Sequence, residues 1–185
     1  MKNTYVTGYF PLLSIMAFSL SFSVYLTLTT ILFLKSNGLF SGMTEFLSET
    51  NIKLSFLLLF FICFFMLFAA LKLLVDTFIE LSLLFFSKDE IGEDLQKLRG
   101  ASIIFLIGGL VSMLCYLSIW WLMGCFVLTA LIAFIYFLNK ISSSLSGAGL
   151  IGMIFFHVTV WVVLLLGICL SIFKLYNSII AGLPL

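Results

Sequence analysis

The chain has 185 residues, of which 63% are hydrophobic and only 9% are charged, and its mean hydropathy is +1.31. A soluble domain would have to display such a composition on its surface, so the class indicated is a polytopic membrane protein with an all-α transmembrane bundle. The net charge of +1, with no basic cluster, excludes nucleic acid as a partner. The four cysteines lie in apolar runs without a C-x-x-C pair, so we expect no metal site and no cofactor.

The first apolar run predicts an uncleaved membrane helix over residues 11–34. The run is longer than the apolar core of a secretory signal and lacks a small-x-small cleavage site. Hydroxyl side chains recur on one face of this helix, at Ser19, Ser23, Thr27 and Thr30. We favour a stripe that packs against another helix or bonds back to carbonyls of its own helix, and the alternative is a stripe that lines an aqueous path.

A second apolar run ends in three ionisable residues at i, i+4 and i+8 spacing, Lys72, Asp76 and Glu80. The uncharged residues before Lys72 are just enough to cross a hydrocarbon core of about 30 Å. We therefore expect a span over 54–74 that continues to residue 86 as a helix outside the membrane.

The alternative window, 63–86, places all three charges at depth, where each costs roughly 2.5–3.5 kcal/mol. At the membrane surface the three residues form a solvated face with an i,i+4 ion pair. Buried between helices, they could hold a cation or pass a proton. Their depth therefore decides between a structural and a functional role.

The most charged part of the chain, SKDEIGEDLQKLRG, covers residues 87–100. Its first four residues, Ser87 to Glu90, match the S/T-x-x-E capping box at a helix start. Ile91, Leu95 and Leu98 then follow at helical spacing. The pattern predicts a short cytoplasmic amphipathic helix between the second and third spans, and this segment is our candidate for contact with a partner.

Residues 100–139 contain no charged side chain. One straight helix of that length would reach about 60 Å, twice the hydrocarbon core, so two spans over 101–118 and 122–138 are favoured, with a turn near 118–124. This interpretation gives five spans in total. A single crossing of this region is the alternative and gives four.

The last span is expected over 149–173, and it contains the chain's single histidine, His157. With Trp161 it forms H-x-x-x-W, which resembles the proton relay and gate of influenza-type viral proton channels. The interpretation we favour is a structural histidine, hydrogen-bonded to a hydroxyl or carbonyl of a neighbouring helix, with the hydroxyl stripe of the first span as its partner if His157 faces it. A lone histidine without acids at its depth does not indicate a metal site.

The opening MKNTYVTGYFPLLS, the chain length and the layout of apolar runs resemble the YufK-type family of small Bacillus membrane proteins. The resemblance implies a bacterial inner-membrane location and assigns no catalytic or binding residue. Lysines and arginines counted on alternate sides of the bilayer place the N-terminus and residues 87–100 in the cytoplasm.

No hydrolase, metalloprotease, P-loop or dinucleotide-binding motif is present, so we do not expect an enzyme. The leading hypothesis is a multi-pass protein of the lipid bilayer that acts through helix packing and protein contacts, as a homo-oligomer or with a membrane-protein partner. The alternative is a small transporter or proton- or ion-conducting protein that uses Lys72, Asp76, Glu80 or His157.

Overall fold

The computed structural model describes residues 8–89 and 100–182, and within them the chain is helical with no β-strand. The all-α fold predicted from composition is therefore confirmed. The elements are α2 (Phe10–Ser36), α3 (Leu39–Thr44), α4 (Glu49–Phe86), α6 (Ala101–Ser112), α7 (Ile119–Ile141), the 3-10 turn η2 (Ser142–Ser144) and α8 (Gly147–Ala181).

Local sequence signals mark several of the helix ends. Pro11 lies in the first turn of α2, where its missing N–H is not needed. Ser48 caps α4 by accepting a hydrogen bond from the Asn51 N–H, and Ser146 caps α8 by accepting one from the Gly149 N–H. Between α2 and α3, Gly38 adopts a positive φ of 71°, which lets the chain turn sharply.

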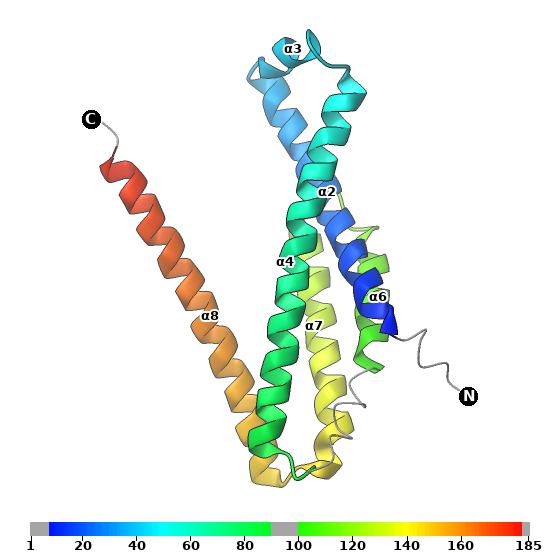
Figure 1. Ribbon diagram of the computed structural model, residues 1–185, viewed down its shortest axis with the longest axis vertical. Coiled ribbons are helices and arrows are strands. Elements are labelled where there is room, and N and C mark those ends of the chain that lie inside the picture. Colours follow the sequence, from blue (N-terminus) through cyan, green and yellow to red (C-terminus); the bar gives the residue numbers. More distant parts are fainter. Residues whose placement is uncertain (1–7, 90–99, 183–185) are drawn as a thin grey trace.

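Successive long helices run in alternating directions (Figure 1). Helix α4 is antiparallel to α2, and α6 and α7 form a hairpin beside them. Gly100, just before α6, lies against Tyr136 near the end of α7, because a Cβ built at Gly100 would be 2.3 Å from the Tyr136 hydroxyl. The hairpin therefore starts and ends at the same end of the bundle.

Three buried apolar clusters are stacked along α4, and each includes one of its residues. Ile52 joins Ile31 and Phe40, and Phe68 joins a cluster with Phe18, Phe22 and Leu122. Leu83 joins Phe137, Ile141 and Met153. Helix α4 is thus the central element, and these contacts fix the height of every other helix along it.

The structure corrects the hairpin expected over residues 101–138. Helix α6 has 12 residues, about 18 Å, and ends at Ser112 instead of 118. The turn occupies 113–118 instead of 118–124, and α7 begins at Ile119. Within the described residues, four helices are long and apolar enough to cross a membrane, and α6 is not one of them. The five-span count is not confirmed.

Two other expected elements differ from the structure. Helix α8 continues to Ala181, eight residues beyond the expected end at 173. Of the segment expected to form an amphipathic helix, Ser87 to Asp89 are not helical, and residues 90–99 lie outside the described part of the chain. By contrast, α4 is continuous to Phe86, as the sequence predicts.

Candidate functional site

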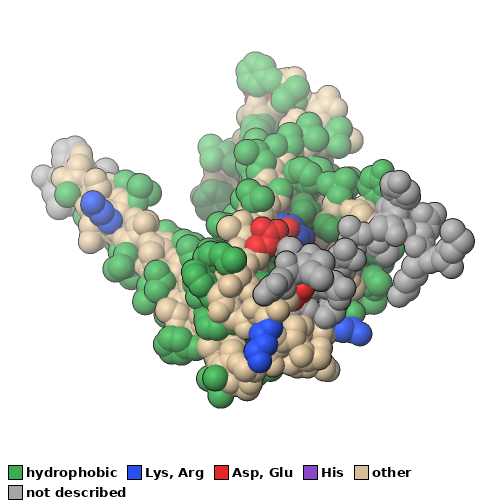
Figure 2. Space-filling model, turned by 60° about the horizontal axis from the view of Figure 1, so that its bottom comes forward, with side chains coloured by type: hydrophobic (Ala, Val, Ile, Leu, Met, Phe, Trp, Pro, Cys, Tyr) green, Lys and Arg blue, Asp and Glu red, His purple; other side chains and the backbone are tan. Residues whose placement is uncertain are grey.

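Two of the three charges after the second apolar run are brought together. The Lys72 ammonium bonds both carboxylate oxygens of Asp76 one helical turn away. The two side chains are 35% and 46% exposed, respectively. Glu80 is exposed, and no ion pair includes it in the described part of the chain. Among the residues coloured by type in Figure 2, a view of the lower end, charged side chains form only small patches.

The contacts between α4 and α7 set the depth of this ion pair. Phe68 of α4 packs against Phe126 of α7, with ring centroids 5.2 Å apart. Eleven residues further along α4, Ile79 packs on the same cluster as Phe134 of α7. Lys72 and Asp76 lie between these two levels.

The ion pair therefore lies beside the middle third of α7, residues 126–134. Helix α7 is one of the four described helices that are long and apolar enough to cross a membrane. The window of α4 that lies in lipid, 54–74 or 63–86, stays a prediction. In lipid the pairing offsets part of the cost of each charge.

His157 is buried, with 5% of its surface exposed, on the face of α8 that packs against the bundle. Its Nδ1 lies 3.0 Å from the carbonyl oxygen of Met153, one turn back in the same helix. The ring is surrounded by three phenylalanines, with the nearest centroid, that of Phe134, at 5.1 Å. The expected partner on a neighbouring helix is thus replaced by a carbonyl of α8 itself.

The hydrogen bond to Met153 fixes the tautomer of the imidazole. Nδ1 must carry the hydrogen in order to donate to a carbonyl, so Nε2 is left as an acceptor. Nε2 is buried and has no hydrogen-bond partner among the described residues. Trp161 packs edge-on against Phe78 of α4, with centroids 6.3 Å apart, and no ring contact joins it to His157 in that part of the chain.

The hydroxyl stripe of α2 is largely buried. Ser19 donates to the Ile15 carbonyl at 2.6 Å, and Ser23 donates to the Ser19 carbonyl. Thr27 is 6% exposed, and its hydroxyl has no partner among the described residues, whereas Thr30 is half-buried. Two of the four hydroxyls are thus satisfied by the backbone of their own helix.

No group of three or more His, Cys, Asp or Glu side chains is placed to hold a metal ion in the described residues. The four cysteines are free thiols. The polar groups available for chemistry are thus the α4 ion pair, Glu80, His157 and hydroxyls.

Comparison with known proteins identifies the family. A family model described as "Family of unknown function (DUF5366)" matches residues 27–184. The chain belongs to this family. It is 41% identical over 184 residues to the uncharacterized membrane protein YufK of Bacillus subtilis (strain 168), with 100% of each chain covered. No solved structure matches. The resemblance found at the start of the sequence is therefore confirmed.

In this DUF5366 protein, sequence reasoning missed a close contact between α2 and α6. Gly109 of α6 faces α2 so closely that a Cβ there would lie 3.0 Å from the Ala17 Cβ. Ser21 of α2 and Ser112 of α6 are hydrogen-bonded through their hydroxyls at 2.8 Å. The Gly108-Gly109 pair in an apolar run was the available signal, because small residues let membrane helices approach closely.

Proposed function

We propose that this protein is a non-enzymatic, multi-pass protein of the bacterial inner membrane that acts by binding other membrane-spanning helices through α8. The observation that carries the proposal is the exposure of this helix: every described residue from Leu165 to Gly182 is exposed. Figure 1 shows α8 leaving the bundle as it rises from its first turns. A second membrane helix would cover this half of α8.

The first half of α8 packs closely on the bundle. A Cβ built at Gly152 would lie 2.6 Å from the Phe86 ring, and Met153 is fully buried. Helical geometry places Gly167 and Ser171 on the same face, several turns further along. A Cβ at Gly167 would meet nothing within 4 Å.

Small residues on one face permit close helix–helix approach, which lipid chains do not require. The packing face of α8 therefore continues beyond the bundle with the residue types that suit a second helix. Lys174 follows on this face toward the end of the helix, where a long side chain can reach the headgroups.

Cysteine crosslinking in native membranes tests this function. In a chain whose four cysteines are replaced, Ser171→Cys should form an oxidative crosslink, because it lies on the proposed contact face. The matched control retains only Cys169, which is exposed on the opposite face of the same turn and should not crosslink. Crosslinking of neither position, or of both equally, would contradict the proposal. The mass of the product distinguishes a second copy from another membrane protein.

The orientation we propose has the N-terminus and residues 87–100 in the cytoplasm. Lys88 and Lys140 support it, because both lie at the end of the bundle where α4 and α7 finish, and lysines in short loops favour the cytoplasmic side. Labelling of Lys88→Cys by a membrane-impermeant maleimide should require permeabilised cells. Labelling of intact cells would reverse the orientation.

A second candidate function, proton or ion conduction, is favoured by the Lys72–Asp76 pair beside the middle of α7 and by the buried Nε2 of His157, which has no partner among the described residues. Protein reconstituted in vesicles should then carry a flux that His157→Ala and Asp76→Asn reduce. A vesicle with no flux at any pH, or with a flux that neither substitution changes, removes this candidate and leaves the first intact.

A further inference from the structure

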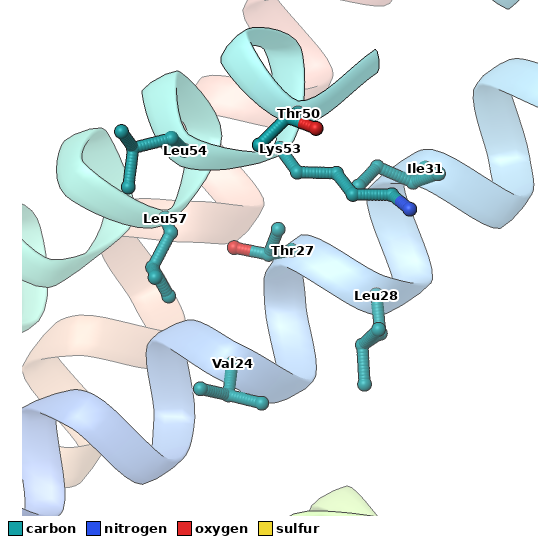
Figure 3. A pocket seen from close by; sticks show the side chains of 8 residues that line it. All are labelled: Val24, Thr27, Leu28, Ile31, Thr50, Lys53, Leu54 and Leu57. Atoms are coloured by element: carbon teal, nitrogen blue, oxygen red, sulfur yellow. The ribbon is translucent and has the colours of Figure 1, made fainter.

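A groove of about 280 Å³ opens between α2 and α4, near the end of the bundle where the two helices are joined through α3. Its walls are apolar, and polar side chains stand at one end (Figure 3). The lining residues are Val24, Thr27, Leu28, Ile31, Thr50, Lys53, Leu54 and Leu57. A flexible apolar chain fits the chemistry of these walls.

The Thr27 hydroxyl is a polar feature inside the groove. The residue is 6% exposed, its Oγ1 has no hydrogen-bond partner in the described part of the chain, and Figure 3 shows the oxygen turned into the space between the helices. A buried hydroxyl without a partner costs free energy, so an acceptor supplied by a ligand would stabilise it.

Cationic side chains stand at the mouth of the groove. Lys53 and Lys35 share one carboxylate, that of Glu49, with Nζ–Oε1 distances of 2.8 and 3.2 Å. Two cations and one anion leave a local excess of one positive charge. Glu45, the other acid at this end, lies in the α3–α4 turn, beside Met43 and Leu47, which line a different groove.

The position along α4 suits a membrane surface. Helix α4 has 38 residues, about 57 Å, which exceeds a hydrocarbon core of about 30 Å, so its first turns reach the headgroup region. In Figure 3 the Lys53 ammonium lies beside Ile31, and Thr27 is one helical turn of about 5.4 Å from Ile31 toward the bundle centre. The cation is thus nearer the headgroups than the hydroxyl.

We propose that this groove binds one acyl chain of an anionic glycerophospholipid, with Lys53 at the headgroup phosphate and the Thr27 hydroxyl donating to the ester carbonyl. The lipid then accounts for the apolar walls, the unpartnered donor and the excess cation in one ligand. A headgroup with net negative charge is preferred over a zwitterionic one, because the single carboxylate of Glu49 already serves two lysines.

Two substitutions that break the same ion pair separate lipid binding from stability. Lys53→Gln and Glu49→Gln both remove the Lys53–Glu49 contact, but they change the local charge in opposite directions. Native mass spectrometry of the purified full chain measures binding of phosphatidylglycerol and of phosphatidylcholine with identical acyl chains. We expect Lys53→Gln to weaken phosphatidylglycerol binding about fivefold and Glu49→Gln to strengthen it by a similar factor. Equal affinities for the two lipids, or shifts in the same direction, would overturn the proposal.

The hydroxyl is tested with a matched pair of threonines. Thr27→Val should weaken binding of both lipids severalfold, because the ester carbonyl loses its donor. Thr29→Val should not, because the exposed Thr29 hydroxyl already donates to the Tyr25 carbonyl at 3.0 Å. A phosphatidylglycerol with a photoreactive acyl chain should label Leu28 and Leu54. Labelling spread evenly over the surface of the helices would mean annular lipid only and would also overturn the proposal.

Discussion

The contact between α2 and α6 and the second half of α8 show two opposite uses of small residues in one chain. In the first, Gly109 is buried against α2, its neighbour Gly108 is buried against Thr129 of α7, and hydroxyls of α2 and α6 are bonded across the interface. In the second, Gly167 and Ser171 are exposed and have no neighbour from another helix. Similar small residues therefore lie in a packed helix–helix interface between α2 and α6 and on an exposed helix face in the second half of α8.

The reason for the difference lies in the connections between helices. The α6–α7 hairpin is held against α2 and α4 by the cluster that includes Phe18, Phe68 and Leu122. Helix α8 is held only near its start, by contacts that end with Trp161 on Phe78. No described element covers the second half of α8, so its apolar surface is open to lipid or to another helix.

The largest expected effect is a loss of stability at Gly108, which is tightly packed, and the comparison is with Gly167, which has open space around it. Gly108→Ala would place a Cβ 2.1 Å from the Thr129 Oγ1 and 2.8 Å from the Thr129 Cβ, so rotation of the threonine cannot relieve the contact. We expect a loss of about 2–3 kcal/mol in the free energy of unfolding in detergent.

The matched substitution Gly167→Ala has open space around it and gains helix propensity, so it should stabilise the monomer by up to about 1 kcal/mol. Unfolding titrations of the two variants against the parent measure both effects. Equal losses at the two positions would show that α8 packs as tightly as α6 and would contradict the comparison.

A medium loss in the free energy of unfolding is expected when the α4 ion pair is broken. Its size reports how deep in the membrane the pair lies. Asp76→Asn leaves the Lys72 ammonium without its partner, so beside the middle of α7 it should cost about 2–3 kcal/mol in lipid. Glu80→Gln is the control, because Glu80 is exposed and has no ion pair in the described residues. If the pair lay at the membrane surface, breaking it would cost only a few tenths of a kcal/mol. Unfolding in lipid bicelles distinguishes the two depths.

Much of the fold follows from composition and periodicity, because a long apolar run must be a helix in lipid. The continuous helix to Phe86 and the three charges in register on it were predicted in this way. The end of α6 at Ser112 was not predicted, because residues 100–139 contain no charged residue or proline that would mark a turn. The position of Lys72 and Asp76 beside the middle of α7 was also out of reach, because it depends on contacts between helices.

For the candidate site, spacing along one helix was informative and contacts between helices were not. The i,i+4 geometry correctly brings Lys72 to Asp76, because both residues lie on α4. The same spacing does not bring the Trp161 ring to His157, since the indole packs on Phe78 of another helix. Thr27 was predicted as part of the stripe, but its lack of a partner depends on how α4 passes over it.

The smallest expected effect tests whether the completed interface depends on its hydroxyls or on its shape. Each of the two hydroxyls also has a carbonyl of its own helix within reach, Ala17 at 3.0 Å from Ser21 and Gly109 at 2.7 Å from Ser112. Two hydroxyl protons thus serve three contacts, so the bond across the interface competes with a bond inside one helix. A double-mutant cycle with Ser21→Ala and Ser112→Ala should therefore give a coupling of about 0.6 kcal/mol. A coupling well above that value would make the hydroxyl pair, instead of the close approach at Gly109, the main source of stability between α2 and α6.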